Sequence, residues 1–366
     1  MTHIRTVQAN RFEGDCMENA HQPLRIKAFI AGCAISLYAP LVVAQPPNPE
    51  LVLALSQSVA KVHIEDAQGR LGVGSGVVVA VNHVATNCHV IANARGIAVN
   101  KMGESFAPIA LKADWRHDLC ILKFDNLPLK PFEYGEADKL HYEQHVMALS
   151  YSGNSPKPVE SFGTVKALIP LDGSVLVRTT AGFRMGASGG ALLDYDGKLV
   201  GFTTFKSPGR NSQYFSLPVE WVKDLLEQPD VELTAQMEQP FWDVPENERP
   251  FFMQVVQPLQ TEAWSTLELI SKAWVTVEPD TPEAWLHLGL AQQGLQDYKA
   301  AKVSYNRVLT LAPTHSTAYY QLGLIAKLQG DMLEVIRISE VLDSIDTDFA
   351  ETYNLDMGLV TAQAPA

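Results

Sequence analysis

Three residues spread along the chain have the side chains that nucleophilic catalysis needs: His89, Asp118 and Ser188. A serine hydroxyl is a poor nucleophile until a base takes its proton. An imidazole acts as that base when a carboxylate holds its tautomer and stabilises the imidazolium. We therefore expect Ser188 to attack a carbonyl carbon, His89 to shuttle the proton and Asp118 to orient His89. The chemistry that this combination serves is acyl transfer through a covalent intermediate.

Ser188 lies in a run of small residues, "GASGG", at positions 186–190. Gly186 leaves the backbone free to turn its N–H toward a substrate oxyanion, where the N–H of Ser188 joins it. We expect these two groups to form an oxyanion hole. Side chains at Gly189 and Gly190 would crowd an approaching peptide backbone, which accounts for the other two glycines.

The segments around these residues resemble those of chymotrypsin-like serine proteases, in the same chain order. His89 lies in "VATNCHVI" after a "GSGVVV" segment, Asp118 in "ADWRHDLCILKF" and Ser188 in "GASGG". The resemblance is closest to bacterial trypsin-like peptidases of the HtrA type and covers roughly residues 59–226. It implies a serine endopeptidase built from two six-stranded β-barrels packed face to face, with the active site in the cleft. No PDZ-like β-module follows, so HtrA oligomerisation and PDZ regulation are not carried over.

The specificity of such a site depends on the residues that precede the serine. Gly182 stands where a trypsin-like pocket would carry its acid, and the segment "TTAGFRMGAS" contains no aspartate. A strict preference for Arg or Lys is therefore not expected. By resemblance to the HtrA enzymes we expect a pocket for medium-sized apolar side chains, lined by Gly182, Met185 and Phe205.

The other histidines of this region lack the context of His89; they are His63, His83, His117, His141 and His145. His117 neighbours Asp118 but would point the opposite way on a strand, so we expect it at the surface. No grouping of His, Cys, Asp or Glu has the spacing of a metal site. We therefore expect no metal and no cofactor.

Two cysteines accompany the expected base and acid. Cys88 directly precedes His89, and Cys120 follows Asp118 closely. If His89 and Asp118 touch, the two sulfurs are near neighbours, so we expect a disulfide that staples the two catalytic loops. The oxidising compartment that an export signal implies would favour the bond. The alternative is two buried free cysteines.

Short runs rich in Val, Ile, Thr and aromatic residues fill residues 61–218, separated by turn residues such as "DAQGR", "SGNSP" and "LDGS". About a dozen such strands, with no helical period between them, predict an all-β barrel or sandwich. A short amphipathic helix is expected before them, at 51–60. A second helix, at 218–228, begins with proline.

Later in the chain the composition becomes helical and a repeat appears. "PEAWLHLGLAQQGLQDYKAAKVSYNRVLTLAP" places Trp285 and Gly289 at the spacing of the tetratricopeptide pattern, and Tyr319 and Gly323 follow at its 34-residue period. This predicts stacked helix pairs at 259–350; the alternative is a plain helical bundle. By resemblance, such repeats dock a peptide or protein partner on a concave face.

The pattern of the N-terminal residues is typical of a Sec-type export signal. Arg25 and Lys27 precede an apolar run at 28–44 that ends in small residues. Translation from Met17 would give a more typical signal length. The alternatives are an uncleaved membrane anchor and a lipoprotein box at "IAGC". The Sec-type reading implies a periplasmic or secreted protein.

The expected division of the chain is a signal peptide at 1–44, a trypsin-like protease domain at 45–228, an acidic proline-containing linker at 229–258, tetratricopeptide-like repeats at 259–350 and a tail at 351–366. A net charge of -13 argues against nucleic-acid binding. The leading hypothesis is an exported serine endopeptidase whose helical part presents protein or peptide substrates or binds a protein partner. The alternative is a protease-fold scaffold or adaptor that works mainly by binding through the repeats.

Overall fold

The structure, a computed structural model, describes residues 45–153, 155–207, 212–233 and 238–360. The expected signal peptide at 1–44, with its alternatives, lies outside these residues. Within the part of the chain that is described, no helix is long and apolar enough to cross a bilayer.

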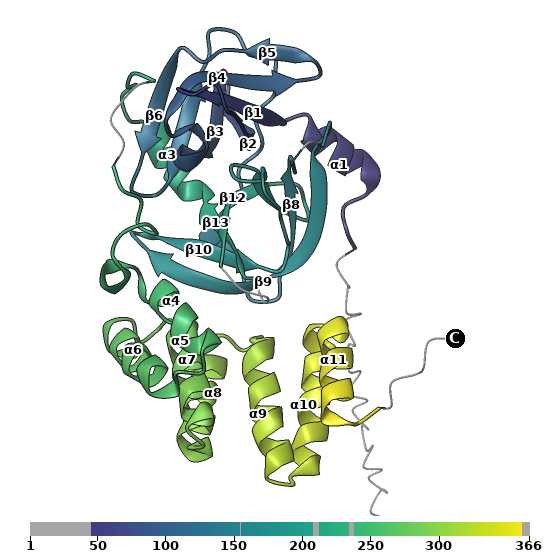
Figure 1. Cartoon of the computed structure of the whole chain (residues 1–366). Helices are drawn as coiled ribbons and strands as arrows, with labels where there is room; N and C mark the ends of the chain where they lie inside the picture. Colours follow the sequence, from purple (N-terminus) through teal and green to yellow (C-terminus); the bar gives the residue numbers. More distant parts are fainter. Residues whose placement is uncertain (1–44, 154, 208–211, 234–237, 361–366) are drawn as a thin grey trace, which may run out of the picture. The chain divides into compact units, whose positions relative to one another are not determined.

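A seven-stranded antiparallel sheet forms the first half of the β region, in the order β5-β4-β1-β2-β3-β7-β6 (Figure 1). Helix α1 (Pro49–Ser56) precedes it. The sequence pattern had extended this helix to residue 60, but Val59 and Ala60 are buried in β1, where they pair with β2. The elements of this half are β1 (Val59–Asp66), β2 (Leu71–Ala80), β3 (His83–Asn87), α2 (Cys88–Ile91), β4 (Ala94–Lys101), β5 (Glu104–Phe106), β6 (Ala110–Asp114) and β7 (Leu119–Lys123).

The later strands close into a six-stranded barrel, in the order β10-β13-β12-β11-β8-β9. A two-residue turn, Asp172 and Gly173, joins β9 to β10. Both residues have positive φ (44° and 83°), the backbone that an Asp-Gly hairpin turn adopts. The elements of this half are β8 (His145–Ser150), β9 (Val159–Leu171), β10 (Ser174–Thr179), β11 (Ala191–Asp194), β12 (Leu199–Lys206), β13 (Tyr214–Pro218) and α3 (Val219–Leu226).

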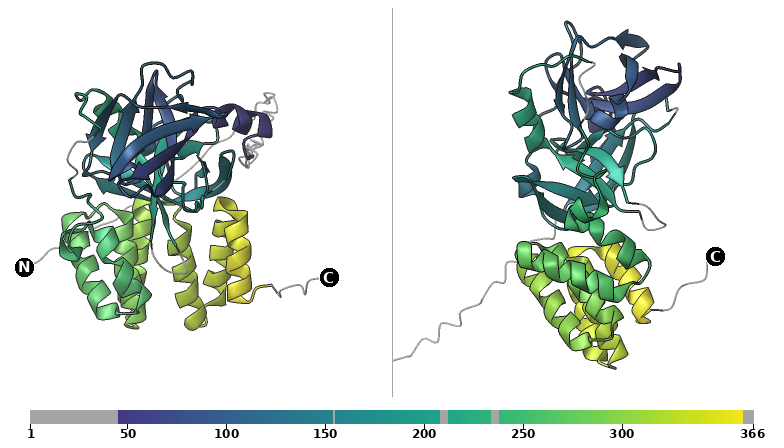
Figure 2. Two further views of the ribbon diagram at one scale, coloured as in Figure 1. Left: turned by 45° about the horizontal axis from the view of Figure 1, so that its top comes forward. Right: turned by 60° about the vertical axis from the view of Figure 1, so that its left-hand side comes forward.

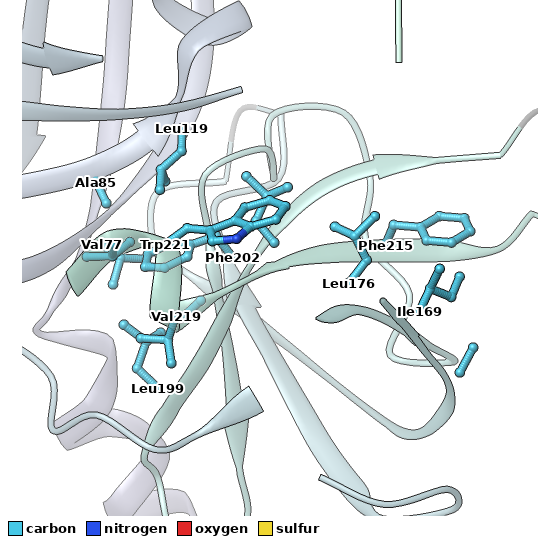
Figure 3. Packing of buried hydrophobic residues seen from close by; sticks show 14 of the residues in the cluster. Val77, Ala85, Leu119, Ile169, Leu176, Leu199, Phe202, Phe215, Val219 and Trp221 are labelled. Atoms are coloured by element: carbon cyan, nitrogen blue, oxygen red, sulfur yellow. The ribbon is translucent and has the colours of Figure 1, made fainter. Parts of the chain in front are cut away.

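One hydrophobic core joins the two β units. Val77 and Leu119 of the first sheet belong to the same buried cluster as Phe202 of the barrel and Trp221 of α3 (Figure 3). Burying one such side chain stabilises the fold by about 1.5–3 kcal/mol. The predicted all-β architecture is confirmed. The first sheet has seven strands where six were implied, because the short β5 pairs with the end of β4.

Gly74, in the "GSG" segment of β2, allows α2 to pack closely on the first sheet. A Cβ at this position would lie 2.4 Å from Cγ1 of Val90. Any side chain here would push α2 off the sheet, and with it His89, which precedes Val90. The glycine therefore helps to set the position of the expected base.

Almost all described residues after 250 are helical, and successive helices run side by side in antiparallel pairs (Figures 1 and 2). Their starts recur with the 34-residue period of the predicted repeat, α7 with α9 and α8 with α10. In the pair of α7 and α8, Gly289 leaves room for the aromatic ring of Tyr305, since a Cβ at position 289 would lie 2.5 Å from Cε1 of that ring. The helices are α6 (Trp264–Val277), α7 (Pro282–Gly294), α8 (Tyr298–Leu311), α9 (Ser316–Leu328), α10 (Met332–Ile345) and α11 (Thr347–Met357).

The stretch 229–258, which the sequence pattern assigned to a linker, is partly folded. Two short helices begin inside it, α4 (Phe251–Gln254) and α5 (Val256–Gln260). Phe252 is buried, and its ring centroid lies 5.4 Å from that of Phe215 in β13. Helical structure therefore begins before residue 259, because apolar side chains after the acidic stretch pack against the barrel.

Candidate active site

The pairing of β3 with β7 brings the expected base beside the expected acid. Asn87, the last residue of β3, lies opposite Leu119, the first residue of β7. His89 and Asp118 stand just beyond these two residues, so both emerge at the same end of the sheet. The N–H of Cys88 donates to the carbonyl of Asp118 at 3.1 Å, which closes the junction.

His89 and Asp118 are joined by two hydrogen bonds. Nδ1 of His89 donates to Oδ2 of Asp118 at 2.6 Å, and the backbone N–H of His89 donates to Oδ1 at 2.8 Å. Because a carboxylate only accepts, Nδ1 carries a proton, and the neutral form of the ring has its lone pair on Nε2. The His89 side chain is 35% exposed while that of Asp118 is 2% exposed. The arrangement is a solvent-facing imidazole held by a buried carboxylate.

Asp118 adopts a backbone conformation that few side chains accept. Its φ is +58°, in the left-handed region, which aspartate tolerates because its short polar side chain can bond locally. Its N–H donates to Trp115 at 3.1 Å, and its carbonyl also accepts from Nδ2 of Asn87 at 3.0 Å. These bonds hold the acid in place before β7 begins.

The expected disulfide is present between Cys88 and Cys120. Both cysteines are buried, and the bond ties the segment of the base to that of the acid. The two residues are 32 positions apart. Closing a loop of this size in the unfolded chain stabilises the folded state by about 4 kcal/mol in the chain-entropy model.

Ser188 lies in the loop between β10 and β11, which two glycines shape. Gly186 and Gly189 have φ of +92° and +83°. A Cβ at Gly189 would lie 2.3 Å from the carbonyl oxygen of Ser75, whose own N–H donates to the carbonyl of Ser188 at 2.8 Å. Among the described residues, the N–H groups of Gly186 and Ser188 have no hydrogen-bond partner. Two backbone donors beside the serine hydroxyl are thus available to an incoming oxygen.

Thr204 in β12 connects Ser188 with Asp118. The hydroxyl of Ser188 donates to the carbonyl of Thr204 at 3.1 Å, and the hydroxyl of Thr204 donates to Oδ2 of Asp118 at 3.3 Å. The sequence analysis missed Thr204, although "GFTTF" follows the serine block in a predicted strand. In this resting geometry, Ser188 is bonded to Thr204 and His89 to Asp118.

The three expected pocket residues do not surround one cavity. Gly182 lines a cavity of about 410 Å³ together with Phe183 and Arg184. Met185 is 90% exposed. Phe205 instead stacks on Phe215, with ring centroids 4.9 Å apart. The tight turn before Ser188 directs Met185 outward, and the half-buried Phe205 packs against the edge of the core.

His117 is half-buried, whereas strand alternation predicted an exposed side chain. It lies in the turn between β6 and β7, and its side chain is only 14% exposed. Its ring packs on Trp221 with centroids 4.0 Å apart and hydrogen-bonds Asp114 and Asp172. The expectation was wrong because the residue is not in a strand. Among the described residues, no cluster of His, Cys, Asp and Glu could hold a metal ion.

Comparisons with known proteins agree with this architecture. Residues 74–202 match the family model of the trypsin-like peptidase domain, and residues 282–315 match that of the tetratricopeptide repeat. The chain therefore contains a trypsin-like peptidase domain followed by a tetratricopeptide repeat.

Over its peptidase region the chain is homologous to HtrA- and DegP-like serine endoproteases. It is 30% identical over 176 residues to the periplasmic pH-dependent serine endoprotease DegQ of Escherichia coli, covering 45% of this chain and 38% of DegQ. It is also 30% identical over 198 residues to the serine endoprotease DegS of Haemophilus influenzae, covering 49% of this chain and 57% of DegS. The chain thus spans less than two thirds of either relative. Among solved structures, the active form of the Rv3671c protease of M. tuberculosis aligns at 23% identity with a TM-score of 0.46, over 53% of this chain and 94% of that one.

Proposed function

We propose that this chain is an exported serine endopeptidase that hydrolyses peptide bonds in protein or peptide substrates. The observation that carries the proposal is the doubly hydrogen-bonded pair of His89 and Asp118, which Thr204 links to Ser188. A buried acid, a base with a free Nε2 and a serine in a glycine-shaped loop are the parts that acyl transfer requires. His117 makes the same two bonds with Asp114, so the features that distinguish His89 are the burial of Asp118 and the connection through Thr204 to Ser188.

In the proposed reaction, the hydroxyl of Ser188 leaves Thr204 and bonds to Nε2 of His89. The oxygen attacks the substrate carbonyl while its proton passes to His89, and Asp118 stabilises the imidazolium. The N–H groups of Gly186 and Ser188 bind the oxyanion. His89 then gives the proton to the leaving amine, which breaks the peptide bond and leaves an acyl-enzyme. Water, deprotonated by His89, hydrolyses that ester and restores Ser188.

The edge of β12 offers a place for the substrate backbone. Beyond Thr203, which bonds to Gly189 and Gly190, the described residues leave Lys206 without a strand partner on the side of Ser188, whereas Phe205 pairs with Phe215 of β13. An extended peptide can add to such an edge as a further strand. We infer that the residues before the scissile bond bind there. Gly182 remains our candidate for the pocket of the cleaved residue, which we propose accepts medium-sized apolar side chains.

The remaining assignments follow from the same proposal. Residues 45–228 act as the protease domain, and the segment 229–258 connects it to the repeats. The repeats at 259–350 dock a protein partner or present substrate. The segment 1–44 directs export to the periplasm or the medium. The match to the tetratricopeptide model supports the docking role of the repeats. The name of the relative DegQ, a periplasmic endoprotease, supports export.

The decisive experiment is labelling with a fluorophosphonate probe, which reacts with activated serines. We expect the wild-type protein to be labelled and Ser188→Ala to be neither labelled nor able to cleave a peptide library, while circular dichroism shows the fold intact. A library profile of the wild type would also define the cleaved residue. Equal labelling of both proteins would refute the assignment of Ser188.

A second candidate function is a protease-fold scaffold that works by binding through its repeats. The observation in its favour is the hydrogen bond of Ser188 to Thr204, which leaves His89 unengaged by the serine. Labelling of the full chain, alone and with candidate partner peptides, separates the two functions. A scaffold stays unlabelled under every condition, whereas an enzyme that a partner activates becomes labelled when the partner binds.

A further inference from the structure

A segment outside the peptidase domain, residues 239–244, lies against the candidate active site. Phe241 is 3% exposed, and its N–H donates to the carbonyl of Arg116 at 2.9 Å. Arg116 belongs to the turn that carries Asp118 into the site. Trp242 is half-buried. The segment is therefore fixed to the loop of the expected acid by both a backbone hydrogen bond and apolar burial.

Two successive residues of this segment contact the two sides of the site. The ring centroid of Phe241 lies 6.1 Å from that of Phe205 in β12, in an edge-on arrangement. That of Trp242 lies 5.9 Å from the imidazole of His89, with the rings at 88°. Phe205 directly follows Thr204, which bonds Ser188. Phe241 and Trp242 thus span the distance between the base and the strand edge proposed to bind substrate.

A peptide with its scissile carbonyl at Ser188 runs back along the edge of β12, past Phe205. Side chains of an extended peptide alternate between its two faces. The residue just before the cleaved one (P2) therefore turns away from the pocket near Gly182 and toward the space between His89 and Phe205. Trp242 and Phe241 border that space.

We propose that Phe241 and Trp242 form a specificity wall that restricts the P2 residue of the substrate to small side chains. The inference rests on the proposed endopeptidase function and adds a determinant that the peptidase domain alone lacks. Among the described residues, none of 239–244 hydrogen-bonds the backbone of Lys206, so the strand edge proposed to bind substrate keeps its backbone groups. Selection arises because a rigid aromatic wall excludes volume at one substrate position.

The test compares Trp242→Ala with wild type in the full chain. Peptides share one cleaved residue and carry Gly, Ala, Leu or Phe at P2, and kcat/KM is measured for each. We expect the ratio of kcat/KM for Leu or Phe over that for Gly to rise about tenfold or more in the variant, as a few methylene groups in an apolar pocket change discrimination by such factors. Trp242→Phe, which keeps a smaller ring, should give an intermediate ratio.

The matched control is Trp285→Ala, which removes an indole from the repeats and should leave the P2 ratio at the wild-type value. Continued labelling of Trp242→Ala by the fluorophosphonate probe shows that the variant folds. A uniform rise in kcat/KM for all four peptides would overturn the proposal and identify the segment as a plug. An unchanged ratio would overturn it as well. Absence of Ser188-dependent labelling in every protein would instead remove the proposed function on which the inference rests.

Discussion

Thr204 is a positioning residue of the candidate active site. Its hydroxyl donates to Asp118 at 3.3 Å and accepts from Nδ2 of Asn87 at 3.0 Å, while its carbonyl accepts from Ser188 at 3.1 Å. Hydrogen bonds to a charged acceptor contribute more than neutral ones. The hydroxyl therefore helps to fix the carboxylate that orients His89, without itself reaching the substrate.

Thr204→Val should lower kcat about tenfold and leave KM unchanged. The substitution keeps the shape of the side chain but removes one donor from Asp118 and one acceptor from Asn87, and a loss of about 1.4 kcal/mol in the transition state is tenfold in rate. Steady-state kinetics on one peptide substrate measure both constants. Thr204→Ser keeps the hydroxyl and should retain most of the activity. If kcat of Thr204→Ser is as low as that of Thr204→Val, the loss of the hydroxyl does not explain the lower activity of Thr204→Val.

At the scale of the secondary-structure elements, a cluster of charged side chains connects the turn before β7 to the hairpin of β9 and β10 by hydrogen bonds. Asp172 at the hairpin tip accepts from Nε2 of His117 at 2.9 Å and from Arg116 at 2.9 Å, and Nδ1 of His117 is bonded to Asp114 at 2.6 Å. Burial by itself lowers the pKa of His117, but the hydrogen bonds to Asp114 and Asp172 outweigh it and raise the pKa above its ordinary value. The His117 ring thus bridges the two β units, and these hydrogen bonds favour its protonated form.

The contribution of His117 to stability should decrease as the pH rises. Because the pKa of His117 is higher in the folded state, its stabilisation is complete below the unfolded value of about 6.5 and is lost as the pH passes the raised folded value. The difference in urea midpoint between wild type and His117→Gln should therefore shrink from about pH 6 to about pH 9. His83→Gln, whose ring bonds a backbone carbonyl, serves as the control. A difference that stays constant over this range would contradict the prediction.

At the scale of the whole molecule, hydrogen bonds to buried carboxylates join the segment just before β8 of the six-stranded barrel to the repeats. Tyr142 donates to Oε2 of Glu283 in α7 at 2.6 Å, and Ser316 in α9 donates to Oε1 of Glu143 at 2.6 Å. Burial raises the pKa of the fully buried Glu283, but His315 and Tyr142 more than offset this and lower it. A buried carboxylate is costly unless it is paired or hydrogen-bonded. The helices are thus attached at defined positions as well as by apolar packing.

Tyr142→Phe should reduce the free energy of unfolding by about 2 kcal/mol, since the loss of one donor leaves the buried charge of Glu283 less compensated. Urea denaturation followed by circular dichroism measures the change. Tyr319→Phe is the matched control, because the Tyr319 hydroxyl has no hydrogen-bond partner among the described residues. Equal midpoints for the two variants would mean that the bond to Glu283 contributes nothing to stability.

Much of the architecture could be predicted from local patterns. Alternating β-branched runs with "DG"-type turns predicted the β region, and the 34-residue recurrence predicted the helix pairs, because each depends on neighbours close in the chain. The Cys88–Cys120 bond could also be predicted, since the two cysteines adjoin residues expected to touch. The assignment of His89, Asp118 and Ser188 as catalytic stays a prediction. The direction of Met185 and the burial of His117 were not predictable, as both depend on turn geometry.

The sequence by itself determined which residue types stand at the chemistry-bearing positions, the order of β and helical parts and the period of the repeat, because these are properties of composition and spacing. Only the tertiary structure decided that Thr204 would join Ser188 to Asp118. It alone placed Trp242, far along the chain, beside His89 and brought Tyr142 to Glu283. The physical reason is that such contacts follow from packing surfaces that meet after folding, and no local spacing encodes which distant side chain will fill a given gap.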